Sequence, residues 1–292
     1  MSVKVSVIVP TYCRDTELER ALASLAAQTE RSFEVIVVDD NAEPSWNQRT
    51  ARCIALCREH FPELQLQYIQ NEHNMGSAMN RNIGIEFAQG DYVTFLDDDD
   101  EYFPDKLRHQ LCAMERAGAD YSLTDLNLYI ERGTLIERRV RRYLETCPAE
   151  DLMEQHLLHH LTGTDTLMFR RDYLQHIGGF DPIDLGDEFY LMCKAIAGCG
   201  HFCYVPGCQV MAYVHTGDNG LSSGMQKIQC ENDLYAYKKN YFDGLCAKTK
   251  RYIHMRHYAV LAFAHLRMRK LPGALYIGLT SLKQRWDLGP RR

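Results

Sequence analysis

Residues 92–101 read Tyr-Val-Thr-Phe-Leu-Asp-Asp-Asp-Asp-Glu, a short apolar run followed at once by five carboxylates. The apolar run has the composition of a buried strand, and the acidic run begins where that strand must end. Adjacent ionised carboxylates raise one another's pKa values, so a nearby cation is needed to keep all of them charged. The simpler alternative is a solvated acidic turn that caps a helix beginning near Pro104. The place of the strand in a sheet decides between the two interpretations.

The chain before this stretch alternates strand-like and helix-like segments. Strand patterns cover residues 3–9, 33–38, 64–70 and 92–96, and helical spacing of apolar residues covers 15–28, 47–60 and 77–88. Such alternation predicts a doubly wound α/β fold, in which ligands bind at the carboxyl ends of the strands. The acidic run then lies at the ligand-binding edge of the sheet, and its hard oxygen ligands suit Mg²⁺ or Mn²⁺.

Beyond residue 104 the pattern changes to mixed α and β segments. Helices are expected at 104–116, near 149–160 and at 187–198, and strand-like pieces near 119–142 and 210–214. A Gly- and Ser-rich loop at 215–224 precedes a helical tail. We therefore expect a main domain over residues 1–224 and a helical extension over 225–292.

Composition is that of an ordinary globular chain, with 292 residues, 46% hydrophobic and 25% charged. No apolar run approaches the roughly 20 residues that a membrane span needs, and no signal-peptide pattern is found. We expect a cytoplasmic protein whose 11 cysteines are packed thiols.

Charge is distributed unevenly along the chain. Residues 225–292 contain 14 Lys and Arg against 4 Asp and Glu, whereas residues 1–224 contain 19 against 35. An acidic main domain argues against binding of nucleic acid. The basic tail requires a separate explanation.

An ordered set of motifs resembles those of the family 2 glycosyltransferases. They are SVIVPTYCR at 6–14, VIVVDDN at 35–41, NMGSAMNRNIGIEFAQGDYVTFLDDDD at 74–100 and IGGFD at 177–181. The resemblance covers about residues 3–215 and implies the Rossmann-like GT-A nucleotide-diphospho-sugar transferase fold. It divides the main domain into a nucleotide-binding half, 1–103, and an acceptor-binding half, 104–224. It also implies inverting transfer of a sugar from a nucleotide diphosphate, with a divalent metal at an Asp-x-Asp motif.

The resemblance assigns donor-binding roles residue by residue. Thr11, Tyr12 and Asp40 match positions that hold the nucleotide base, Pro10 shapes the turn before them, and Arg81 matches a position that meets the nucleotide or its phosphates.

The metal site follows from the same resemblance. Asp97 and Asp99 form the Asp-x-Asp pair, with Asp99 on Mn²⁺ or Mg²⁺ and either Asp97 or Asp98 on the ribose. His215 matches a histidine that reaches the metal or the diphosphate, in a loop that folds over the donor, although a lone His is often an ordinary polar residue.

The catalytic base is expected at the start of the helix at 187–198. Family members usually have Glu-Asp there, whereas this chain has Asp187-Glu188. Aligning Leu191 with the helix leucine of the family places Glu188 as the base and Asp187 as a capping neighbour. Two N-terminal carboxylates favoured by the helix dipole are the structural alternative.

These assignments predict an inverting, metal-dependent glycosyltransferase of cell-surface polysaccharide synthesis. A UDP-sugar is the expected donor, because in the family an Asp here accepts a hydrogen bond from the uracil imide N–H. The expected acceptor is a glycan or a lipid-linked sugar. A sugar-phosphate nucleotidyltransferase would show a Gly-rich loop where this chain has Pro-Thr-Tyr-Cys-Arg. A receiver-like signalling domain would end after about 120 residues and would not need the later motifs.

The basic tail allows three interpretations. It forms a helix packed on the acidic main domain, a surface that contacts an anionic membrane peripherally, or a homodimer contact. The apolar and cationic positions of residues 248–270, which end before Pro272, predict a helix in each case.

Overall fold

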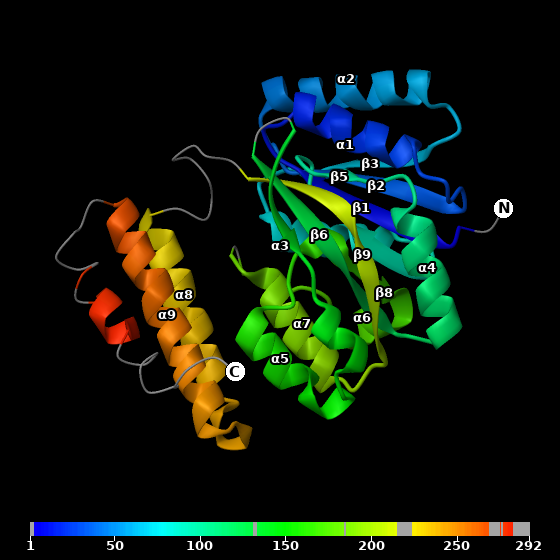
Figure 1. Cartoon of the computed structure of the whole chain (residues 1–292). Helices are drawn as coiled ribbons and strands as arrows, with labels where there is room; N and C mark the ends of the chain where they lie inside the picture. Colours follow the sequence, from blue (N-terminus) through cyan, green and yellow to red (C-terminus); the bar gives the residue numbers. More distant parts are fainter. Residues whose placement is uncertain are drawn as a thin grey trace. The chain divides into compact units, whose positions relative to one another are not determined.

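In the computed structural model of the chain, the described residues are 3–130, 133–183, 185–214, 224–268, 275 and 277–282. They form two compact units (Figure 1). The first contains residues up to 149 and from 161 to 214, and the second contains 150–160 and the described residues from 224 onward. Residues 150–160, which the sequence analysis included in the main domain, belong to the same unit as the C-terminal helices.

The first unit is built on one nine-stranded sheet, with the order β3-β2-β1-β4-β8-β6-β9-β5 and with β7 paired to β6. Strands β3, β2, β1 and β4 run parallel, as predicted, whereas β8 is antiparallel to both β4 and β6. The short strands β5 and β8 were not predicted. The strands are β1 (Val5–Thr11), β2 (Phe33–Asp39), β3 (Gln65–Gln70), β4 (Tyr92–Phe95), β5 (Glu101–Tyr102), β6 (Tyr121–Ile130), β7 (Thr134–Arg139), β8 (Leu167–Arg170) and β9 (Phe202–Val214).

Helices form where apolar residues recur at helical spacing. The predicted helices are confirmed to within a few residues at their ends. In the first unit they are α1 (Thr16–Ala26), α2 (Pro44–His60), α3 (Ser77–Phe87), α4 (Lys106–Ala117) and α7 (Asp187–Ala197), and the short helix α6 (Arg171–His176) was not predicted. In the second unit they are α5 (Leu152–His159), α8 (Gly224–Lys239) and α9 (Ala247–Arg267).

Helices cover both faces of the parallel part of the sheet. Alternate residues of β1, including Val5 and Val7, join a core with apolar residues of α1, α2 and α4. On the opposite face Ile8 lies against Gly84 of α3, where a Cβ would come within 2.4 Å of the Ile8 side chain. Figure 1 shows α1 and α2 on one side of β1 and β2, and α3 on the other. Burial on both faces explains why these strands read as continuous apolar runs.

The second unit has a core of its own. Helices α8 and α9 lie side by side (Figure 1), and the Tyr235 ring stacks on the His257 ring with centroids 4.0 Å apart. Lys238 Nζ donates to the Leu157 carbonyl at 2.9 Å, which ties α8 to α5. Ser281 Oγ donates to the Met255 carbonyl at 2.8 Å, which holds the last described helical residues on α9. Among the described residues, no helix combines the length and the apolar character that crossing a bilayer would require.

Candidate active site

The carboxyl ends of β1, β2 and β4 meet at one edge of the sheet. Thr11 pairs with Asp39 across β1 and β2, and Ile8 pairs with Phe95 across β1 and β4. The parallel register therefore brings the residues that follow each strand together. Thr11 Oγ1 donates to Asp98 Oδ2 at 2.8 Å, which joins the first strand end to the acidic run.

Arg14 neutralises the middle of the acidic run. Its Nη1 lies 2.5 Å from Asp98 Oδ1 and its Nη2 lies 3.0 Å from Asp99 Oδ2. Burial raises the pKa of Asp98 to about 6 even though Arg14 opposes the shift. The guanidinium therefore holds two neighbouring carboxylates that would otherwise repel each other.

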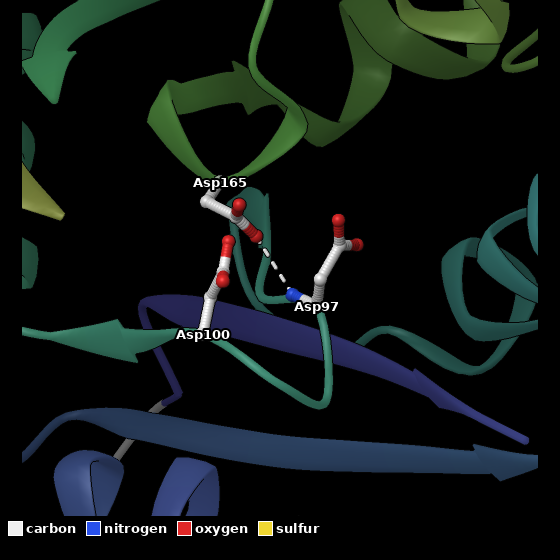
Figure 2. A group of neighbouring side chains, drawn as sticks. All are labelled: Asp97, Asp100 and Asp165. Carbon is white, nitrogen blue, oxygen red and sulfur yellow. Dashed lines mark hydrogen bonds between the residues drawn. The ribbon is translucent and has the colours of Figure 1, made fainter. Parts of the chain in front are cut away.

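Asp97, Asp100 and Asp165 form a second acidic cluster, shown in Figure 2. One carboxylate oxygen of each lies within 4.8 Å of those of the other two. The Asp97 N–H donates to Asp165 Oδ1 at 2.7 Å. Burial, and then repulsion from Asp97, raise the pKa of Asp165 to about 7. Burial and the Asp165 charge also raise the pKa of Asp100, so this pair retains a proton well above the usual carboxyl range.

Asp165 was missed by sequence reasoning. It lies in a 3₁₀ turn, Thr164–Thr166, that follows Gly163 with a φ of +110°. Only a residue without a Cβ adopts that backbone readily, and it turns the chain back toward β4. The Tyr102 hydroxyl donates to the Asp165 carbonyl at 3.2 Å and itself accepts from buried Lys106 at 3.0 Å. An isolated Asp in a Gly-Thr-Asp-Thr turn carries no periodic signal in the sequence.

Arg81 joins the acidic run to the start of α7. Its Nη2 lies 2.6 Å from Asp97 Oδ1, and its Nη1 lies 2.7 Å from Asp187 Oδ2. The side chain is only 5% exposed and lies 5.4 Å from the centroid of the Phe180 ring. One guanidinium thus holds the start of α7 close to the acidic run that follows β4.

The two carboxyl groups at the start of α7 have different surroundings. Asp187 is buried and paired with Arg81, whereas Glu188 is partly exposed. Partial burial of the carboxyl group, and after it the charge of Asp187 and a hydrogen bond with Asp187, raises the pKa of Glu188 to about 8. Gly186, with a φ of +78°, forms the N-cap and lets the chain turn sharply into the helix. The surroundings of Glu188 therefore make its carboxylate more basic than that of an ordinary glutamate.

The residues assigned to the nucleotide base have mixed exposure. Tyr12 is 53% exposed, whereas Thr11 and Asp40 are 2% exposed. Asp40 accepts from the backbone N–H groups of Met75 at 2.7 Å and Gly76 at 2.9 Å, and from Asn71 at 3.0 Å. A carboxylate has about four acceptor positions, so Asp40 can accept one further hydrogen bond. Pro10 is in β1, which leads into this edge.

A model of the family described as "Glycosyl transferase family 2" matches residues 6–178, more than half of the chain. The chain belongs to glycosyl transferase family 2. The match leaves the receiver and nucleotidyltransferase interpretations without support. Family 2 membership is what the ordered motifs implied, and the residues of the acidic run and of Arg81 lie inside the matched range.

Solved structures share the fold of this family 2 chain. S. aureus TarS, crystallised as residues 1 to 349 with UDP-GlcNAc, matches with a TM-score of 0.63 at 16% identity, covering 96% of this chain and 92% of that one. A mannosyltransferase from Pyrobaculum calidifontis, in complex with GDP-Man and Mn²⁺, matches with a TM-score of 0.61 at 20% identity, covering 100% and 77%. The expected GT-A fold is therefore confirmed.

Curated relatives of the chain include glycosyltransferases and a polysaccharide biosynthesis protein. The succinoglycan biosynthesis protein ExoO of Rhizobium meliloti is 26% identical over 94% of this chain and 81% of its own length. The chain spans only 18% to 34% of the length of four other relatives, which are described simply as glycosyltransferases and match at 34% to 39% identity.

The acidic edge of this family 2 chain fits a divalent cation. Its donor set consists of carboxylates only, which is what Mg²⁺ and Mn²⁺ prefer. Burial, and after it repulsion between neighbouring carboxylates, raises the pKa values of Asp98, Asp100 and Asp165, so a bound cation would stabilise their ionised forms. His215, the other expected metal ligand, lies outside the described residues, as does the loop after it.

Proposed function

We propose that this chain transfers a sugar, with inversion, from a nucleotide diphosphate to a hydroxyl of a glycan or lipid-linked acceptor in surface polysaccharide synthesis. The observation that carries the proposal is the bridge of Arg81 between Asp97 and Asp187. It supports placing the donor's diphosphate and a basic carboxylate, Glu188, at the same edge of the sheet. The name of the succinoglycan relative supports the polysaccharide context.

Each group in the proposed site has a separate task. Asp99 would bind the metal, and either Asp97 or Asp98 binds the ribose of the donor. A bound Mn²⁺ or Mg²⁺ would supply positive charge against the leaving diphosphate. Glu188 accepts the proton of the acceptor hydroxyl as that oxygen attacks the anomeric carbon from the side opposite the leaving group. Asp187 and Arg81 orient the helix that carries Glu188.

Release of a nucleoside diphosphate tests the proposal directly. The enzyme is incubated with Mn²⁺ and a panel of nucleotide sugars, and the diphosphate released is measured with and without extracts of surface glycan. Acceptor-dependent release of a nucleoside diphosphate is the expected result. Release of pyrophosphate, or no turnover with any donor, would contradict it.

The nucleotide is expected to be uridine diphosphate. Asp40 has one acceptor position left for the N3–H of uracil, a donor that cytosine lacks and that a guanine presents on a differently shaped ring. The two solved structures with this fold are complexes of UDP-GlcNAc and GDP-Man, so the fold alone does not select the nucleotide.

With Mn²⁺ present, UDP is expected to raise the melting temperature by about 5 °C or more at a hundredfold excess over its Kd, and CDP and GDP by clearly less. Thymidine diphosphate is the matched control, because it keeps the imide edge and should stabilise comparably. A larger shift with GDP than with UDP would overturn the assignment of Asp40.

We also propose that the C-terminal unit contacts an anionic membrane surface. Leu275, Leu279 and Leu282 follow helical spacing and are 57% to 68% exposed, although Ser281 of the same stretch faces α9. A helix that served only as scaffold would bury these leucines instead. Their exposure, with an excess of ten cations over 225–292, matches the composition of interfacial helices.

Co-sedimentation with vesicles tests this contact. Binding to vesicles containing phosphatidylglycerol, but not to neutral vesicles, is expected, and it should weaken as salt screens the charges. Changing both Leu275 and Leu279 to Ser should reduce binding by at least about tenfold, given the apolar area that each leucine contributes. Met225→Ser, at a residue 62% exposed on α8, is the matched control. Arg256 is not a suitable test site, because its Nη1 lies 2.7 Å from His160 Nε2.

Absence of binding to anionic vesicles at low salt would contradict the membrane contact. A concentration-dependent dimer that the two leucine substitutions abolish, seen by light scattering without vesicle binding, would show that a second copy covers these leucines instead.

A further inference from the structure

Arg14 lies in the loop between β1 and α1 and contacts two adjacent carboxylates at once. Its Nη1 is 2.5 Å from Asp98 and its Nη2 is 3.0 Å from Asp99. The other oxygen of Asp98 accepts from Thr11 Oγ1 at 2.8 Å and from the Tyr12 N–H at 3.2 Å. Neutral donors therefore fix Asp98 independently of Arg14.

The two arginines of the acidic edge differ in accessibility. The Arg81 side chain is 5% exposed and is enclosed by Asp97, Asp187 and the Phe180 ring. The Arg14 side chain is 36% exposed. Removing Arg81 from its partners would leave its own buried charge without compensation, whereas the partly exposed Arg14 side chain can leave Asp98 and Asp99 when another cation takes its place. Arg14 is therefore suited to exchange partners and Arg81 is not.

A divalent cation bound by Asp99 would compete with this contact. The guanidinium and the metal both need the same carboxylate oxygens, and two cations cannot share them closely without repulsion. A donor diphosphate arriving with the metal would bring new anionic oxygens, for which a guanidinium is well shaped because it donates two parallel hydrogen bonds.

We propose that Arg14 and the metal replace each other on Asp99. Before the donor binds, Arg14 is the counter-ion of Asp98 and Asp99. Once the metal occupies Asp99, Arg14 contacts the donor's diphosphate instead. This inference rests on the metal-dependent transfer proposed above. It adds a phosphate-binding residue that the motifs did not single out.

The exchange predicts opposite effects of one substitution on two ligands. In Arg14→Gln, Mn²⁺ alone should bind at least about fivefold more tightly, because its competitor is gone. UDP in saturating Mn²⁺ should bind at least about fivefold more weakly, because one phosphate contact is lost. Both affinities of Arg14→Lys should lie between those of Arg14→Gln and the wild type, since lysine keeps the positive charge but lacks the two parallel N–H donors of the guanidinium.

Arg20→Gln is the matched control. Arg20 also pairs with a carboxylate of this region, with Nη1 3.3 Å from Glu101 Oε1, and its Cζ lies 5.2 Å from the centroid of the Tyr213 ring. The Arg20→Gln substitution removes the same charge close to the acidic run but changes no contact with Asp98 or Asp99. Both affinities in this variant should stay within about twofold of the wild type if contact, rather than overall charge, is responsible.

Mn²⁺ affinity is measured by the electron paramagnetic resonance signal of the free ion, and UDP affinity by calorimetry. Unchanged or weaker Mn²⁺ binding in both Arg14→Gln and Arg14→Lys would overturn the exchange, as would an equal tightening in Arg20→Gln. Failure of the wild type to bind Mn²⁺ would instead remove the metal from the proposed function, and the exchange with it. Circular dichroism establishes that the variants compared are folded.

Discussion

Glu188→Gln is expected to lower kcat by about 10² to 10⁴, the scale of losing a general base, while the Kd for the nucleotide stays within about twofold. The amide keeps the size of the side chain and its place at the start of α7, but it cannot accept the hydroxyl proton. Glu188 is partly exposed and its pKa is raised to about 8 by burial and by Asp187, so its carboxylate holds a proton more readily than an ordinary glutamate. Turnover is followed by diphosphate release and binding by calorimetry.

Asp187→Asn provides the comparison within the same turn. Asp187 is buried and lies 2.7 Å from Arg81, so its loss should act mainly on stability and on the position of α7. We expect a lower melting temperature and a smaller loss of turnover than in Glu188→Gln. A larger kinetic effect at Asp187, with the fold intact, would show that the base is one residue earlier than assigned.

The raised pKa of Glu188 also sets the direction of the pH dependence. A base works in its ionised form, so kcat/KM should rise with pH and level off near the pKa of about 8. The same burial opposes ionisation in the folded state, so the carboxylate reduces folding stability as pH rises toward 8. Glu188→Gln should therefore be at least as stable as the wild type at pH 9, which separates loss of the base from loss of the fold.

The sequence predicted the parts of the site that local pattern and sheet topology determine. Alternating strands and helices placed the residues after β1, β2 and β4 at one edge, and Thr11 and Asp98 do meet there. A single rule about parallel strands was sufficient, because every residue involved lies at the carboxyl end of a strand or within a few positions of it.

The parts that escaped prediction depend on contacts between distant segments. Asp165 approaches Asp97 only because β8 inserts antiparallel between β4 and β6 and the Gly163 turn precedes it. Arg14 belongs to the first motif of the sequence analysis. Its pairing with Asp98 and Asp99, more than 80 positions away, cannot be predicted from a single sequence. Packing of 150–160 with the C-terminal helices is likewise a non-local contact, made through Lys238.

Asp99→Ala is expected to weaken Mn²⁺ binding by at least about 100-fold, since even second-layer substitutions around metals cost 10- to 100-fold. UDP binding should fall with it, and chelator should weaken UDP binding to the wild type but have little further effect on the variant. Calorimetry with and without chelator measures both. Asp105→Ala is the matched control, because Asp105 follows the same run but pairs with Arg108 at 2.9 Å, on the exposed start of α4.

Asp165→Asn decides between two positions for the ion. The oxygens of Asp97, Asp100 and Asp165 lie within 4.8 Å of one another, so this deeper cluster also offers three carboxylate ligands. Burial raises the pKa of Asp100 and raises that of Asp165 to about 7, which favours their protonated forms over metal binding, and Asp165 already accepts the Asp97 N–H. An asparagine at 165 preserves that acceptor, so Mn²⁺ affinity should change little. If Asp165→Asn abolishes Mn²⁺ binding and Asp99→Ala does not, the ion occupies the deeper cluster, and Asp99 then serves only as the partner of Arg14.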